Sequence, residues 1–197
     1  MQFELDLPEH LQTDLLIARR RRALVEAEYI APWITPGMFG RVEVLDIGCG
    51  AAITSIMLAK AMRFHKLRLM DGQQGPYTNG YKPDTKAWED TSRATAIATL
   101  NLEPGSWLVV GPSPDFRGKF SFIMSLISWC HHYPVEVYLP MVQDSLRKGG
   151  RLVVDIRKIT KANKAPEGLS KLLAGGFKEL AILDETNKYT RYVLEKQ

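Results

Sequence analysis

The residues best able to do chemistry stand directly after short apolar segments. Residues 46–50 read Asp-Ile-Gly-Cys-Gly, a second acid is Asp71, and two adjacent histidines are His131 and His132. A Gly-x-Gly turn lets backbone amides approach a ligand, and a carboxylate at the next strand end can bind ribose hydroxyls. A histidine can accept a proton near neutral pH. Together these groups predict a cofactor cradle beside a candidate proton acceptor.

The surrounding segments predict the elements that position these residues. Residues 42–47 suit a strand buried on both faces, residues 51–62 a helix, and residues 66–71 a second strand that ends at the acid. A long segment, 72–85, then reads as a loop in which Tyr77, Asn79 and Tyr81 could touch substrate or cofactor, or as a surface insertion. The strand, glycine turn and helix predict a ligand site at the carboxyl ends of a parallel sheet.

The later segments continue the alternation of strand and helix. The histidines follow the fourth strand, so the segment that carries them, with Cys130, is expected as a loop at the sheet edge. A Gly-Gly pair is expected to precede the fifth strand, and a hairpin ends the chain. The predicted elements are a helix over 88–100, strands over 107–110 and 120–127, a helix over 135–146, a strand to 156, a helix over 166–173, and hairpin strands over 177–183 and 189–194.

Residues 7–30 predict an amino-terminal helix that begins at Pro8 or Glu9. Its apolar positions, with one arginine among them, recur every three or four residues: Leu11, Leu15, Ala18, Arg22, Val25 and Tyr29. The run Arg19 to Arg22 could hold phosphate or nucleic acid, or could form a solvated helix face. We therefore divide the chain into a helical lid or extension, 1–40, and a cofactor-binding domain, 41–197.

The spacing Asp46-x-Gly48-x-Gly50 followed by Asp71 resembles the class I S-adenosylmethionine-dependent methyltransferases. An NAD fingerprint has a third glycine, whereas the equivalent residue counted from Gly48 is Ile53. The resemblance implies an α/β fold: a seven-stranded, mostly parallel Rossmann-like sheet with helices on both faces and a C-terminal antiparallel hairpin.

The resemblance also implies S-adenosyl-L-methionine as the cofactor. The backbone at Gly48 and Gly50 would meet its methionine part, and Asp46 would orient that turn or bind the amino group through water. Asp71 would take the ribose hydroxyls, and Ser113 or Asp115 would lie near the adenine. The residues predicted to bind the cofactor are Asp46, Gly48, Cys49, Gly50, Asp71, Gly72, Ser113 and Ser128.

Residues 125–134 resemble a Ser-x-x-Ser-Trp-x-x-His-Tyr-Pro stretch of some bacterial and phage-related methyltransferases described as sugar or small-molecule enzymes. This match implies a hydroxyl acceptor, with His132 as the base and His131 as the second candidate. A hydrogen-bonded structural histidine is the other interpretation. Amino-methylating nucleic-acid enzymes carry a motif of Asn or Asp, two prolines and an aromatic residue at the end of the fourth strand. This chain has a different stretch there, residues 128–134, which disfavours methylation of DNA bases.

Composition limits the remaining alternatives. The chain has 197 residues, 45% of them hydrophobic, and a net charge of +4. No apolar run approaches the roughly 20 residues of a membrane span, and two cysteines suggest reduced thiols, so we expect a cytoplasmic protein. Cys130, His131 and His132 are adjacent rather than spaced as zinc ligands, so no metal site is expected.

Two other functions stay open. The basic pI near 9.0 and the arginine run favour an RNA or nucleic-acid methyltransferase, whose affinity would fall steeply with salt. A catalytically silent S-adenosylmethionine-binding partner subunit would bind the cofactor without transferring its methyl group. The sequence leaves the oligomeric state undecided.

Overall fold

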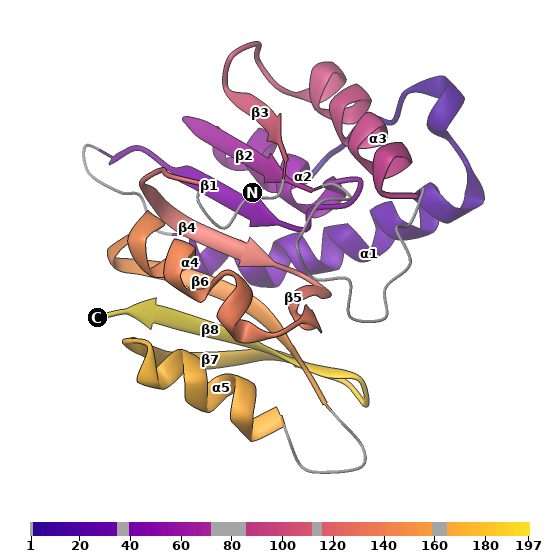
Figure 1. Cartoon of the computed structure of the whole chain (residues 1–197). Helices are drawn as coiled ribbons and strands as arrows, with labels where there is room; N and C mark the ends of the chain where they lie inside the picture. The colour runs from indigo at the N-terminus through magenta and orange to yellow at the C-terminus, as the bar shows by residue number, and fades with distance from the viewer. Residues whose placement is uncertain (1, 35–39, 72–85, 112–115, 159–164) are drawn as a thin grey trace.

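A computed structural model describes residues 2–34, 40–71, 86–111, 116–158 and 165–197. Its centre is one seven-stranded sheet in the order β3-β2-β1-β4-β6-β8-β7 (Figure 1). β1, β2, β3, β4 and β6 run parallel, and β8 runs antiparallel to both β6 and β7. The sheet strands are β1 (Glu43–Ile47), β2 (Lys66–Met70), β3 (Trp107–Val110), β4 (Phe120–Ser125), β6 (Leu146–Arg157), β7 (Phe177–Glu185) and β8 (Tyr189–Lys196).

Helices cover both faces of the sheet (Figure 1), and the strands divide their side chains between two cores. Val44 joins the core formed with α1, α2 and α3, whereas its neighbour Leu45 joins the core formed with α4 and α5. Successive side chains of a strand point to opposite faces, so this alternation follows from strand geometry. The helices are α1 (Asp14–Ile30), α2 (Ile53–Met62), α3 (Lys86–Asn101), α4 (Leu139–Ser145) and α5 (Ala165–Ala174), with short 3₁₀ turns η1 (Glu9–Leu11), η2 (Ala31–Trp33) and η4 (Val135–Val137).

The predicted α/β class, the seven-stranded sheet and the terminal hairpin are confirmed. The predicted hairpin strands match β7 and β8, which pair antiparallel from Phe177 opposite Lys196 to Glu185 opposite Thr190. Short segments rich in apolar residues predicted β1, β2 and β3 to within a residue or two. Fold class was therefore readable from local pattern.

The predicted buried face of the amino-terminal helix is wrong. Leu15 and Val25 are 61% and 56% exposed, and the helix buries a different row toward α2: Leu16, Ala23, Ala27 and Ile30. The helix also starts later than predicted, because the Thr13 side chain caps it by accepting from the Leu16 amide. Residues of α1 share one core with β1, so this segment packs onto the sheet domain.

Three further segments differ from the prediction. The histidine segment, expected as a loop, is a short strand, β5 (Ser128–Tyr133), outside the order of the seven-stranded sheet. The expected helix over 135–146 divides into η4 and α4, since Pro140 lacks an amide hydrogen and favours a helix start next to it. The glycine pair falls inside β6, where pairing shifts between Phe120 opposite Leu146 and Phe122 opposite Arg151.

Candidate active site

The glycine turn joins the end of β1 to α2 and lies against the end of β2. Gly48 and Gly50 have φ of +70° and +54°, a left-handed conformation that glycine adopts without strain. The amides of Gly48 and Cys49 both donate to the Met70 carbonyl, at 2.7 and 3.2 Å. The turn is thus fixed by backbone contacts to the neighbouring strand.

Ser128, predicted from the sequence, lies directly against this turn. A Cβ atom built on Gly48 would stand 1.6 Å from the Ser128 hydroxyl oxygen, so no side chain fits at position 48. Ser125 at the end of β4 holds the same region together, since its hydroxyl donates to the Ile47 carbonyl at 2.8 Å and accepts from the Trp129 amide at 2.9 Å. The ends of β1 and β4 therefore form one packed unit.

The two acids of the predicted motif occupy different environments. Asp71 accepts a hydrogen bond from the Gly50 amide at 2.5 Å, which joins the acid after β2 to the glycine turn. Asp46 is buried and accepts from the Ser55 hydroxyl at 2.5 Å. Burial raises the pKa of Asp46 to about 7, with smaller contributions from the charges of Asp71 and Glu26, while the Ser55 bond opposes the rise.

A pocket of about 390 Å³ opens over the turn, and we call it the glycine-turn pocket. This volume falls within the ~300–1,000 Å³ of small-molecule sites. Its walls are Asp46 and residues 48–54, four residues of α1 (Arg19, Arg22, Ala23 and Glu26), Asp90 of α3, and the turn residues Leu126 and Ile127. The sequence predicted the arginine run as a candidate ligand-binding feature. No local sequence motif predicted that Glu26, Asp90 or Ile127 would line a pocket.

The architecture is shared with known methyltransferase structures. A methyltransferase from Pyrococcus furiosus is 17% identical, with a TM-score of 0.62, over 98% of this chain and 90% of that chain. An rRNA methylase from Streptococcus thermophilus is 14% identical, with a TM-score of 0.56, over 88% of this chain and 95% of that chain. An O-methyltransferase family 2 protein from Planctomyces limnophilus, in complex with apigenin, is 14% identical, with a TM-score of 0.62, over 93% of this chain and 60% of that chain.

The chain has the fold of the class I methyltransferases. No protein-family model matches its sequence, and no curated protein sequence matches it either. The likeness therefore rests on three-dimensional structure. In this methyltransferase fold, the glycine turn lies at the carboxyl end of β1, beside the topological switch where open α/β sheets bind ligands.

The two predicted histidines line a different pocket of the methyltransferase fold. This histidine pocket, of about 340 Å³, is formed by residues 130–136 together with Ile156, Arg157, Glu167, Gly168 and Lys171. The histidine rings are 4.6 Å apart. Burial, then the charges of His132, Arg157 and Lys188, lowers the pKa of His131 to about 4, and burial followed by Arg157 lowers the pKa of His132. Both rings are therefore neutral at pH 7, and the lowered pKa values make them weaker bases than a free imidazole.

The described residues that line the glycine-turn pocket include neither histidine, and they do not include Asp71 or Ser128, which contact the turn from outside the pocket. The structure thus brings Asp46, Cys49, Asp71 and Ser128 together around the turn, and sets the histidines apart on β5. Gly72 and Ser113, together with Asp115 and the loop residues Tyr77, Asn79 and Tyr81, lie outside the described residues.

The thiols and the remaining acids suggest no further chemistry. Cys49 and Cys130 are free thiols whose pKa values burial raises, so both are protonated at neutral pH. Across the described parts of the chain, no three or more His, Cys, Asp or Glu side chains cluster as metal ligands. No described helix is long and apolar enough to span a membrane. A larger cavity of about 730 Å³ lies beside Val42 and Leu67, and none of the predicted site residues lines it.

Proposed function

We propose that this chain is an S-adenosylmethionine-dependent methyltransferase that methylates a hydroxyl group of a small molecule, with sugars among the candidate acceptors. The hydrogen bond from the Gly50 amide to Asp71 carries this proposal, because Gly50 lines an open pocket and the bond joins the two halves of the cofactor motif in the appropriate fold. The similar O-methyltransferase from Planctomyces limnophilus supports a hydroxyl acceptor.

The residues at the turn fit the proposed cofactor. The side of Gly50 where a side chain would stand is open, with only an Asp90 carboxylate oxygen at 4.0 Å, so backbone can approach a ligand there. Gly48, Cys49 and Gly50 would contact the methionine part, and Asp46 would orient the turn or reach the amino group through water. Asp71 would bind the ribose. Gly72, Ser113 and Ser128 complete the proposed cofactor set.

The chain's own task in this reaction is to align an acceptor and manage its proton. Bound S-adenosylmethionine would supply a methyl group already activated by its sulfonium. An alcohol is a poor nucleophile until it loses its proton, and a neutral histidine can take it. We propose His132 for this role and His131 as its alternate, supported by their neutral state. This role requires an acceptor that reaches from the glycine-turn pocket to β5.

Calorimetric titration with S-adenosylmethionine and, separately, with NAD tests the cofactor. We expect saturable binding of S-adenosylmethionine and none of NAD, because the third NAD glycine is replaced by Ile53. Transfer of a labelled methyl group to apigenin, to monosaccharides and to RNA then tests the acceptor. Absence of S-adenosylmethionine binding would remove the proposal, and methylation of RNA alone would replace its acceptor.

An RNA methyltransferase is the second candidate. The rRNA methylase from Streptococcus thermophilus, 95% of which this chain covers, favours it. The exposed Arg19 and Arg22 favour it too, because they line the glycine-turn pocket from α1. Phosphate contacts release counterions, so RNA affinity would fall steeply between 50 and 200 mM salt. Saturable cofactor binding without transfer to any acceptor, together with a stable partner protein, would instead identify a silent subunit.

We also propose a cytoplasmic location. It is supported by Cys49 and Cys130, which are free thiols in a chain with no other cysteines. Proteins of reducing compartments keep their thiols unpaired. Fractionation of the native host followed by detection with an antibody would test this location.

A further inference from the structure

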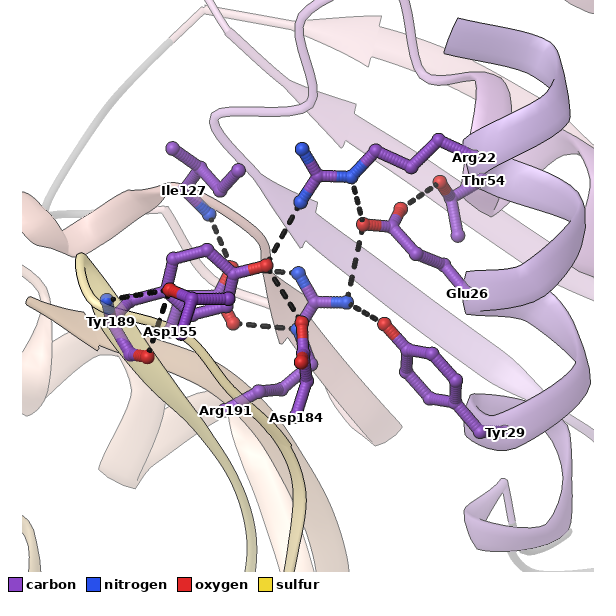
Figure 2. A network of polar contacts seen from close by, with 10 residues as sticks. Arg22, Glu26, Tyr29, Thr54, Ile127, Asp155, Asp184, Tyr189 and Arg191 are labelled. Atoms are coloured by element: carbon purple, nitrogen blue, oxygen red, sulfur yellow. Dashed lines mark hydrogen bonds and ion pairs between the residues drawn. The ribbon is translucent and has the colours of Figure 1, made fainter.

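A buried ion pair lies behind the glycine-turn pocket. Arg191 of β8 and Asp155 of β6 face each other across the antiparallel ladder, and both side chains have no exposed surface. The guanidinium donates two parallel hydrogen bonds to the carboxylate, Nε to Oδ1 at 2.6 Å and Nη2 to Oδ2 at 2.7 Å (Figure 2). Burying two charges is costly, and such a pair often adds little to stability compared with apolar residues of similar volume. The Arg191–Asp155 pair is therefore a candidate for a role other than stabilising the fold.

The second partner of Asp155 is the turn that walls the pocket. Its Oδ2 atom accepts from the Ile127 amide at 2.9 Å. Ile127 has φ of +52°, a conformation that is strained for a β-branched residue and persists only where its surroundings enforce it. Leu126 and Ile127 both line the glycine-turn pocket, and the next residue, Ser128, fills the space beside Gly48. The carboxylate thus holds a strained turn against the glycine turn.

Arg191 also contacts α1, which forms the opposite wall of the same pocket. Its Nη1 atom donates to the Tyr29 hydroxyl at 2.5 Å and lies 3.2 Å from Glu26 Oε1, both on α1. Glu26 in turn accepts from the Thr54 hydroxyl at 2.8 Å, in the first turn of α2 (Figure 2). Glu26 and Thr54 line the pocket. One guanidinium therefore connects both walls without entering the pocket itself.

We propose that Arg191 and Asp155 are positioning residues that hold the Leu126–Ile127 turn and α1 at the geometry required for ligand binding in the glycine-turn pocket. This inference rests on the proposed function for its ligand, S-adenosylmethionine. The arrangement itself, an ion pair holding a strained turn, is independent of which ligand the pocket takes.

The double variant Asp155→Leu/Arg191→Met tests the proposal. It replaces both charges by apolar side chains, which avoids leaving one charge buried alone. We expect the Ile127 amide to exchange its hydrogen about tenfold to a hundredfold faster, as loss of a hydrogen bond to a charged group implies. We also expect affinity for S-adenosylmethionine to fall about tenfold, while the melting temperature stays near that of the natural protein.

The double variant Glu43→Leu/Arg147→Met is the matched control, because it removes an ion pair between β1 and β6 whose residues do not line the glycine-turn pocket, and it leaves the Asp155 to Ile127 bond intact. It should keep both the Ile127 exchange rate and the cofactor affinity within about twofold. If the double variant fails to fold, Asp155→Asn serves instead: it keeps the side-chain shape but weakens the pairing with Arg191, and it should raise Ile127 exchange.

A folded variant with unchanged Ile127 exchange and unchanged cofactor affinity would overturn the positioning role. Faster Ile127 exchange with unchanged cofactor affinity would also overturn the positioning role, because loosening the turn would then have no effect on binding. If the natural protein itself does not bind S-adenosylmethionine, the proposed function fails. In that case the exchange measurement still tests the structural part of the proposal. Unchanged Ile127 exchange in the double variant would show that the ion pair does not stabilise the turn, and faster exchange would show that it does.

Discussion

The backbone amide of Gly50 donates a 2.5 Å hydrogen bond to the carboxylate of Asp71, across the ends of β1 and β2. The acid that the cofactor motif assigns to ribose thus also organises the glycine turn. A hydrogen bond to a charged group is worth about 1.5–3 kcal/mol, enough to make turn geometry depend on this one side chain. Substitutions at Asp71 should therefore affect the turn as well as the proposed ribose contact.

Replacing Asp71 by Ala should weaken S-adenosylmethionine binding by about tenfold to a hundredfold, because both contacts are lost. Asp71→Asn should have a smaller effect, since its amide oxygen can still accept from Gly50. Calorimetric titration measures both affinities. Asp144→Asn, an exposed acid on α4, is the control and should bind normally. Unchanged affinity in Asp71→Ala would take Asp71 out of the site.

Gly48→Ala should destabilise the fold far more than Gly40→Ala. Both glycines have φ of +70°, but an added Cβ at Gly48 meets Ser128 at 1.6 Å, and one at Gly40 meets nothing within 4 Å. The left-handed conformation alone costs about 1–2 kcal/mol, which is the expected loss for Gly40→Ala. Urea unfolding measures the free energy of unfolding of both variants. Adding Ser128→Gly to Gly48→Ala should bring its loss of stability back to that of Gly40→Ala. Equal losses in the two single variants would contradict the packing described.

Asp46 should make stability fall as pH rises. Its folded pKa of about 7 lies above the usual value near 3.9, so the folded protein binds this proton more tightly than the unfolded chain. The resulting stability is complete below about pH 4 and is lost as pH approaches 7, by up to about 1.4 kcal/mol per pH unit. Asp46→Asn should remove this loss, so the stability difference between variant and natural protein should shift in the variant's favour from pH 5 to pH 8. A stability difference that stays constant from pH 5 to pH 8 would contradict this prediction.

His132→Ala should lower kcat by at least about a hundredfold with a hydroxyl acceptor, the usual size of a general-base contribution. Cofactor affinity should change less than about twofold, because the histidines line a separate pocket. Since burial lowers the pKa of His132, the acidic limb of the natural enzyme's pH–rate profile should lie below pH 6.5. His65→Ala, at the residue just before the amino end of β2, is the control. Full turnover in His132→Ala would exclude the base role.

Local pattern predicted the strands well and the helix faces poorly. Short segments rich in apolar residues between breakers indicate strands, and residues 42–47 and 66–70 are such segments. A helix with apolar residues on several sides offers more than one face, and α1 has Leu15 and Val25 on one face, Leu16 and Ala23 on another. Packing against α2 selected the second face, because the small Ala23 and Ala27 let the helices approach closely.

The sequence by itself determined the glycine turn, the acid that follows β2 and the terminal hairpin. Each depends on a short stretch of chain: left-handed φ at Gly48 and Gly50 for the turn, and two apolar-rich segments joined by the polar residues 184–188 for the hairpin. Only the tertiary structure decided which side chains meet across long separations. Arg191 reaches Asp155 through strand register, and Glu26 reaches Thr54 through helix packing. Such contacts leave no local signature, because they arise from how the elements assemble.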